Sequence, residues 1–237
     1  MKIEDLIKDN NVLIIYRLGS HVYGTNNENS DEDFIVVAKE YFDSQNINIH
    51  VYTLEQYKLA LANHDIQALE CHFLPYKHVL KIKGDLGINF TLDKSKLRVS
   101  ISTIASNSFV KGKKKLTVSG DYDVNLAIKS VFHSLRILDF GIQIASEGII
   151  SNYSSMNWLL DDLRKLSEQY QRDELWNAIE TKYKKLFNNK SSQFKALAPK
   201  NLEERDKKNK LLKLLNDSGL DSDGTEDLAD SIMEIFK

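Results

Sequence analysis

Cysteine and proline are scarce in this chain of 237 residues, which contains one cysteine and two prolines. The single Cys71 excludes a disulfide within the chain, so we expect a reducing compartment. Because prolines are few and Leu, Lys and Glu are common, little interrupts helix formation, above all in the second half. The sequence also lacks an apolar run long enough to cross a membrane, so we expect no membrane partner.

An excess of charge of one sign is lacking as well, because 32 basic and 34 acidic residues leave a net charge of −2. This balance excludes a global attraction to nucleic acid, and any such contact requires a local patch. The first ten residues include acids and no apolar core of a signal peptide. We therefore expect a cytoplasmic protein.

Hydrophobic periodicity divides the chain into two regions. Apolar, β-branched runs predict strands at residues 12–17, 34–38 and 47–52, with short helices at 1–10, 54–63 and 66–73. Beyond residue 90 the pattern predicts only helices, at residues 94–110, 122–147, 155–170, 172–188, 201–216 and 225–236, with a loop at 111–119. The predicted fold class is α+β: a small mixed β-sheet domain with helices over residues 1–90, then an all-α helical domain over residues 91–237.

The third predicted strand alternates between apolar and polar residues. Ile47, Ile49 and Val51 share one face, and Asn48 and His50 share the other. At its end, a Thr three residues before a Gln predicts a capping box for the helix that begins at residue 54.

A Gly-Ser pair and two aspartates flank a short polar loop. Gly19 and Ser20 follow the first predicted strand, and Asp31 and Asp33 lead into the second. Residues i and i+2 of a strand point to one face, so we expect both carboxylates to project together toward the Gly-Ser turn. Either half alone is typical of ordinary turns. Together, paired carboxylates suit Mg²⁺ and a Gly-Ser turn suits a phosphate, so the pattern predicts a site for a metal-bound nucleoside triphosphate.

The same loop resembles the signature of the DNA polymerase β-like nucleotidyltransferase superfamily. The stretch Gly-Ser-His-Val-Tyr-Gly-Thr-Asn, followed by Ser-Asp-Glu-Asp-Phe, is most similar to predicted nucleotidyltransferases related to RNA-repair-associated polymerase β-type proteins. The resemblance extends over residues 12–147 and is most specific at 18–34. It implies an α/β nucleotidyltransferase domain that transfers NMP from an NTP to a hydroxyl acceptor.

The resemblance also implies roles for the loop residues. Asp31 and Asp33 would hold two Mg²⁺ ions, which clamp the attacking and leaving oxygens of an in-line displacement. Gly19 and Ser20 would hold the β and γ phosphates. We expect no covalent enzyme intermediate.

One position departs from the superfamily, which carries a third carboxylate on the next strand. Asn48 takes that place, and an amide oxygen can coordinate Mg²⁺ but brings no charge and cannot act as a base. Two interpretations of His50 are open, as an acceptor of the hydroxyl proton or as a strand residue. Glu55 and Glu70 lie nearby and are expected at helix surfaces or in helix support. We expect the missing third carboxylate to impair turnover more than binding of the metal and nucleotide.

Several cations are candidates for binding phosphate. Arg17 ends the first strand, where it either reaches a phosphate or is solvated. The lysine-rich run at residues 111–115 is either a solvated loop or a grip for triphosphate or an RNA backbone. On the helix predicted from residue 122, one face carries Asn125, Lys129, Phe132, His133 and Arg136. Lys129 and Arg136 either meet substrate phosphates or form a salt-bridge network between the domains.

Three hypotheses of function result. The leading one is a Mg²⁺-dependent nucleotidyltransferase whose acceptor is an RNA or tRNA end, a protein hydroxyl or a small molecule. The second is a catalytically impaired nucleotide- or RNA-binding module, because the third carboxylate is missing. The third is a protein AMP transferase. An acidic segment at residues 217–230 fails the calcium-loop pattern and is expected to be a loop.

Overall fold

The computed structural model describes residues 2–217, 228–229 and 232–233. Internal contacts divide the chain into two compact units, residues 1–198 and 199–237. Helix α9 (Leu202–Asp217) belongs to the second unit, and every other element named below belongs to the first. The helix predicted at residues 225–236 and the acidic segment at 217–230 lie mostly outside the described residues.

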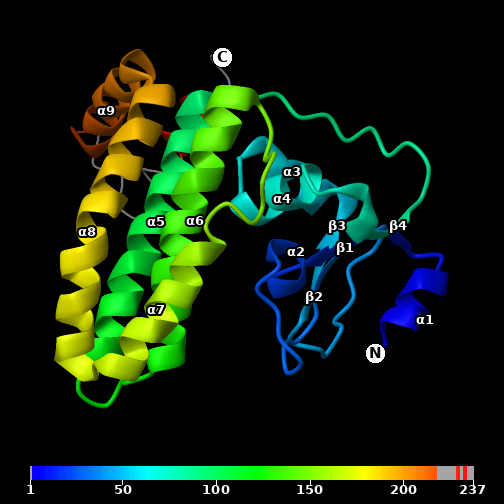
Figure 1. Cartoon of the computed structure of the whole chain (residues 1–237). Helices are drawn as coiled ribbons and strands as arrows, with labels where there is room; N and C mark the ends of the chain where they lie inside the picture. Colours follow the sequence, from blue (N-terminus) through cyan, green and yellow to red (C-terminus); the bar gives the residue numbers. More distant parts are fainter. Residues whose placement is uncertain (1, 218–227, 230–231, 234–237) are drawn as a thin grey trace. The chain divides into compact units, whose positions relative to one another are not determined.

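A four-stranded mixed sheet has the strand order β3-β2-β1-β4 (Figure 1). Strand β2 (Asp33–Ala38) pairs antiparallel with β1 (Val12–Leu18) and parallel with β3 (Ile49–Thr53). β4 (Val79–Ile82) joins the other side of β1 in antiparallel orientation. The sequence predicted the first three strands and missed β4, which is short and only partly buried.

The third strand begins later than its alternation predicts. Ile49 and Val51 are buried as expected, whereas Ile47 is fully exposed. The reason is a turn before the strand, in which Ser44 Oγ donates to the carbonyl oxygen of Ile49 and the Ile49 N–H donates to Asn46. The turn leaves Ile47 in solvent although its spacing fits the apolar face.

Both faces of the sheet are covered by helices. On one face, α1 (Ile3–Lys8) buries Leu6 against the strands. On the other lie α3 (Leu54–Ala62) and α4 (Ile66–His72), and α3 begins with the predicted capping box. The core on this second face continues into Ile101 and Phe140 of the following helices.

Four long helices follow the sheet: α5 (Lys94–Thr117), α6 (Val124–Glu147), α7 (Asn157–Gln169) and α8 (Arg172–Leu197). In Figure 1, α5, α6 and α8 run alongside one another. None of the helices in the described part of the chain combines the length and apolar character needed to cross a bilayer. The α+β class is therefore confirmed, as a mixed sheet with helices followed by a helical region.

The loop predicted at residues 111–119 is wrong for most of its length, because α5 continues to Thr117. Leu116 is buried in the core between the helices. Gly112 lies where a Cβ would come 2.7 Å from a methyl group of Val131, so its lack of a side chain lets α5 approach α6 closely. Packing against α6 thus overrides the low helix propensity of glycine.

The change from strands to helices occurs between β4 and α5, around the predicted boundary at residue 90. The compact unit nevertheless spans residues 1–198, because the sheet shares its core with α5 and α6. This shared packing fixes the helices against the strands that carry the candidate site.

Candidate functional site

The Gly-Ser turn lies directly against Asp33. Gly19 follows β1 with φ 73° and ψ −153°, a backbone conformation open in practice to glycine alone. A Cβ at this position would overlap Oδ2 of Asp33, so the absence of a side chain admits the carboxylate. The chain then forms a short helix, α2 (Ser20–Tyr23), within the region predicted as loop.

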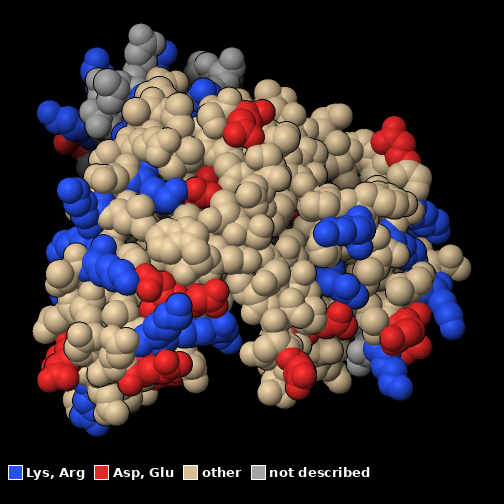
Figure 2. Space-filling model, viewed as in Figure 1, with Lys and Arg blue, Asp and Glu red and all other residues tan. Residues whose placement is uncertain are grey.

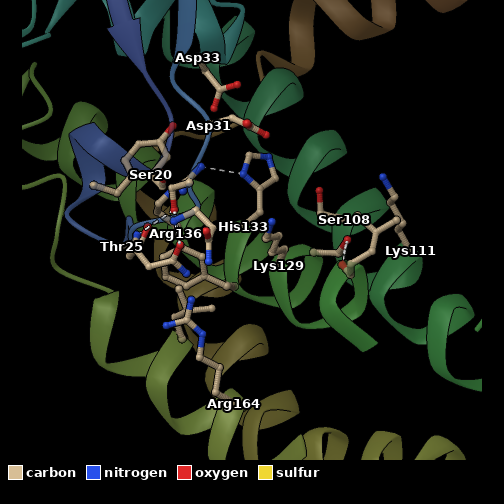
Figure 3. Close-up of a pocket in the computed structure, with 18 residues that line it drawn as sticks. Ser20, Thr25, Asp31, Asp33, Ser108, Lys111, Lys129, His133, Arg136 and Arg164 are labelled. Carbon is tan, nitrogen blue, oxygen red and sulfur yellow. Dashed lines mark hydrogen bonds between the residues drawn. The ribbon is translucent and has the colours of Figure 1, made fainter. Parts of the chain in front are cut away.

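Both aspartates line one cavity, but only Asp33 belongs to a strand, so they do not share a strand face as predicted. β2 begins at Asp33, and Asp31 lies in the loop before it. Partial burial raises the pKa of Asp33, and the negative charge of Asp31 raises it further. The positive charge of Lys129 acts in the opposite direction. In Figure 3 both carboxylates lie at one end of the pocket, above Lys129 and His133.

A cavity of about 740 Å³ opens beside this pair, within the size range of small-molecule sites. Four cations line it together with the two carboxylates: Lys111 from α5, Lys129 and Arg136 from α6, and Arg164 from α7 (Figure 3). Hydroxyl and amide groups complete the polar wall, from Ser20, Thr25, Asn27, Asn29, Ser30, Ser108 and Ser130. The apolar wall is formed by Leu126, Phe132 and Leu160.

Two of the cations are free to meet a ligand. Lys111 and Lys129 are exposed to the cavity and form no ion pair with another described residue. Arg164 is shared with Asp161, at 3.6 Å. In the view of Figure 2, Lys and Arg are interspersed with Asp and Glu, without a continuous basic surface.

Arg136 is the most firmly held cation, with only 6% of its surface exposed. Its guanidinium stacks on the ring of Tyr23, 3.5 Å from the centroid, and its Nη2 donates to Nδ1 of His133 at 2.8 Å. Its buried Nε has no hydrogen-bond partner among the described residues. An unpartnered buried donor is rare and costly, so this atom is a candidate to bind a ligand oxygen.

His133 is held in one protonation state. Burial and the charges of Arg136 and Lys111 lower its pKa to about 3, so the imidazole is neutral near pH 7. Because a guanidinium only donates, Nδ1 accepts from Arg136 and the ring proton is on Nε2. The ring lines the cavity and can donate to an anionic ligand.

Tyr23 ties the Gly-Ser turn to three helices. Its hydroxyl donates to the carboxylate of Glu70 on α4, its carbonyl oxygen accepts from Asn157 Nδ2 at 2.8 Å, and its ring supports Arg136 of α6. Tyr153 donates to the carbonyl oxygen of Glu70 at 2.7 Å. The two regions are thus joined by hydrogen bonds and a cation–π contact, whereas neither Lys129 nor Arg136 forms an ion pair with another described residue, so the predicted salt-bridge network is not seen. Arg136 belongs both to this set of contacts and to the cavity wall.

The two glutamates differ. Glu70 is 3% exposed and buried within this network, so it supports the fold and is not a surface residue. Glu55 is exposed and pairs with Lys58 on its own helix.

Asn48 lies beside Asp33 on the neighbouring chain segment. In the parallel register Phe34 pairs with Ile49, so the preceding residues Asp33 and Asn48 are adjacent, and the Phe34 N–H donates to the Asn48 carbonyl at 2.8 Å. Both residues line a second cavity, together with His50. The position next to Asp33 thus carries an amide, as the sequence indicated.

A metal site in this region rests on two carboxylates. Within the described residues, no group of three or more His, Cys, Asp and Glu side chains is arranged to hold a metal ion. Asp31 and Asp33 are oxygen ligands of the kind a divalent cation prefers. Burial raises the pKa of Asp33 and the charge of Asp31 raises it further, and a bound cation would relieve the repulsion between the two carboxylates. Asn48, which is next to Asp33 by strand register, carries an amide oxygen that can serve as a neutral ligand.

Arg17 lies away from the cavity. It pairs with Phe34 across the strands, on the sheet face opposite Asp33, and forms an ion pair with Glu32 at 3.0 Å. Arg17 is not among the residues that line either cavity, so the structure does not bring this candidate to the others.

The lysine-rich run separates into different environments on α5. Lys111 lines the cavity, Lys113 lies over the ring of Trp176 and Lys115 pairs with Asp121. The helical turn thus directs one member of the run to the site, which a loop would not have done.

No protein-family model, curated protein or solved structure matched this chain. The site is therefore interpreted from its own geometry. Ser108 and Arg164 were missed in the sequence, and no local pattern marks either one, because only the packing of α5 and α7 against α6 brings them to the cavity.

Proposed function

We propose that this protein is a Mg²⁺-dependent nucleotidyltransferase that transfers NMP from a nucleoside triphosphate to a hydroxyl acceptor. One observation carries the proposal: a single cavity joins the carboxylates of Asp31 and Asp33, of which Asp33 packs against Gly19, to a set of cations from three helices. Paired acids suit the metal and the cations suit the polyphosphate. The resemblance of the loop to the polymerase β-like superfamily supports the same function.

Asp31 and Asp33 would hold the metal, with Asn48 as a neutral oxygen nearby. When bound, Mg²⁺ supplies positive charge to the phosphate oxygens on which negative charge develops. Cys71 is buried and unpaired, which supports a reducing, cytoplasmic location as part of the proposal.

The side chains of the cavity would position the triphosphate. Lys111 and Lys129 pair with its oxygens as mobile point charges, whereas Arg136 is fixed in advance by stacking on Tyr23. His133 donates from Nε2 and, with a pKa of about 3, is too weakly basic to accept the acceptor's proton near pH 7. Positioning and neutralisation of charge are the contributions of this chain.

In the proposed reaction, the acceptor oxygen bonds to the α phosphorus as the bond to the bridging oxygen breaks. Pyrophosphate leaves, and the hydroxyl proton is released to solvent. The cations hold the departing phosphates throughout the displacement.

Labelled nucleotide tests the proposal directly. The protein is incubated with Mg²⁺, α-labelled NTPs and a total cell extract, beside the double variant Asp31→Ala, Asp33→Ala. We expect transfer of label by the wild type and a loss of at least about 100-fold in the variant, since charge stabilisation of this kind contributes on that order. Glu32→Gln is the matched control, because Glu32 lies between the two aspartates in sequence but pairs with Arg17 across the sheet. Equal labelling by the double variant would contradict the proposal.

A second candidate function is a nucleotide-binding module that has lost turnover, which the amide of Asn48 beside Asp33 favours. Under this alternative, calorimetry detects binding of MgATP while no label is transferred. Asn48→Asp then separates the two functions: a gain of transfer identifies the vacant position of the third carboxylate, and binding without any gain supports the module.

A further inference from the structure

Asp33 lies where two cavities meet. The second cavity, of about 620 Å³, shares four residues with the first: Tyr23, Asp33, His133 and Arg136. The rest of its wall comes from the sheet and the turns beside it, from α4 with its cap, and from Ile104 of α5. Its polar groups belong to Asn48, His50, Asp65, Gln67 and Glu70. A molecule in either cavity would therefore contact the same carboxylate.

The two cavities differ in charge. Among the described residues of its wall, the first carries four cations and two carboxylates. The second carries one cation, Arg136, and three carboxylates, from Asp33, Asp65 and Glu70. A triphosphate is attracted to the first cavity, where cations outnumber carboxylates, and repelled from the second, where carboxylates outnumber the cation.

The acids of the second cavity are fixed in place. Asp65 caps α4, where its carboxylate accepts from the N–H groups of Gln67 and Ala68 at 2.9 and 3.2 Å. The buried carboxylate of Glu70 accepts from Tyr23. Asn48, His50 and Gln67 add neutral donors and acceptors suited to hydroxyl groups, and Ile47, Ile66 and Ile104 add apolar surface. The wall thus fits a polar ligand without phosphate.

Resting on the proposed nucleotidyltransferase function, we propose that the second cavity binds the hydroxyl acceptor, and that this acceptor is a small molecule that is uncharged or positively charged. The cavity has the volume of a small-molecule site. A phosphorylated acceptor such as an RNA end would place phosphates beside Asp65 and Asp33, where no lysine lines the wall among the described residues. The nucleotide in the first cavity and the acceptor in the second meet at Asp33.

The first experiment sorts acceptors by charge. Low-molecular-weight metabolites of a total cell extract are separated by anion exchange into retained, phosphorylated compounds and unretained, neutral or cationic compounds. Each fraction, total RNA and total protein are incubated separately with the full chain, Mg²⁺ and α-labelled ATP. We expect label in the unretained fraction. Label in RNA, in protein or in the retained fraction overturns the proposal, as does the absence of transfer to every fraction.

A second readout separates failure of this inference from failure of the proposed function. Binding of MgATP is measured by calorimetry on the wild type and on Asp31→Ala, Asp33→Ala. Binding that requires the aspartates, combined with label in RNA or protein, overturns only the acceptor class. Binding that is absent, or labelling that is equal in the double variant, overturns the proposed function itself.

Charge variants at one exposed position test the role of the second cavity. Gln67 lies on the surface of α4 and, of the two cavities, lines only the second. Gln67→Lys and Gln67→Glu therefore change the charge of the second cavity. Both Lys and Glu are good helix formers, so an exposed helix position tolerates them. With a cationic acceptor from the unretained fraction, we expect Gln67→Lys to raise the acceptor KM about two- to fivefold and Gln67→Glu to lower it. The KM for ATP is expected to stay unchanged in both. An unchanged acceptor KM in both variants overturns the assignment of the cavity.

Discussion

The strand region and the helical region contribute opposite charges to the candidate site. The carboxylates and the Gly-Ser turn come from residues 19–33, the connection from β1 to the first residue of β2. The cations come from residues 111–164, on three helices. Local sequence therefore specifies the acidic half, whereas packing of the helices against the sheet assembles the basic half. Each half can be perturbed separately, and the expected effects differ in size.

The largest effect is expected from Gly19→Ala in the strand region. A methyl group there would overlap the Asp33 carboxylate and force a backbone conformation that costs about 1–3 kcal/mol for a non-glycine residue. Because displacement of a positioned group by about 1 Å can cost about 100-fold in rate, we expect transfer activity to fall by roughly that factor. Urea unfolding and the labelling assay measure the two effects.

Gly120→Ala is the control for this variant. Gly120 also has a positive φ, of 82°, but open space surrounds the position of its Cβ. We expect a modest loss of stability, of about 1–2 kcal/mol, with unchanged activity of the folded protein. If both variants lose activity equally, the contact between the turn and Asp33 is not the reason.

An intermediate effect is expected in the helical region, within the lysine-rich run of α5. Lys111→Gln removes a cation from the cavity wall, whereas Lys114→Gln removes an exposed one outside it. We expect the first to weaken MgATP binding about two- to fivefold and the second to leave it unchanged, as measured by calorimetry. Added salt is expected to reduce the difference through screening. Equal weakening by both variants would indicate a diffuse field instead of a defined wall.

The smallest effect is expected in the pH dependence of stability. The pKa of Asp33 in the folded protein is raised above the 3.8 of an unperturbed Asp, by partial burial and by Asp31. At pH values between 3.8 and the raised pKa of folded Asp33, the folded protein binds more protons than the unfolded chain. The free energy of unfolding therefore decreases as the pH rises through this window. Asp33→Asn removes the penalty, so we expect it to be more stable than wild type at neutral pH and equal to it below pH 3.8.

Urea unfolding at a series of pH values measures this difference. Asp31→Asn is the companion variant. It removes the charge of Asp31, so the pKa of folded Asp33 rises less above 3.8 and the pH range over which stability changes becomes narrower. Addition of Mg²⁺ to the wild type is also expected to narrow this pH range, because a bound cation lowers the pKa of Asp33. A stability difference independent of pH would contradict the role of ionised Asp33.

Strands and the acidic motif were predictable because their signals are local. The runs around Ile14 and Val36 are apolar and β-branched, and both residues are buried in the sheet. The capping box at Thr53 and Gln56 depends on neighbouring residues and is confirmed. Ile47, in contrast, follows the same alternation but lies in solvent, since a turn held by Ser44 shifts the start of β3.

The basic half of the site was predictable only in part. Helical spacing places Lys129, His133 and Arg136 on one face of α6, and all three line the cavity. Arg17 is in a strand, and no sequence pattern indicated that it would form an ion pair with Glu32 on the opposite face of the sheet. Arg164 comes from a helix whose sequence shows no sign of a site.

By itself, the sequence determined the α+β class and the placing of Asp33 beside Gly19, because strand pairing and turn geometry act over a few residues. The tertiary structure alone decided which cations face those acids and that Asp33 lies between two cavities of unlike charge. The physical reason is that such contacts join residues about a hundred positions apart. The burial of a shared core sets their distances, and local propensity does not encode it.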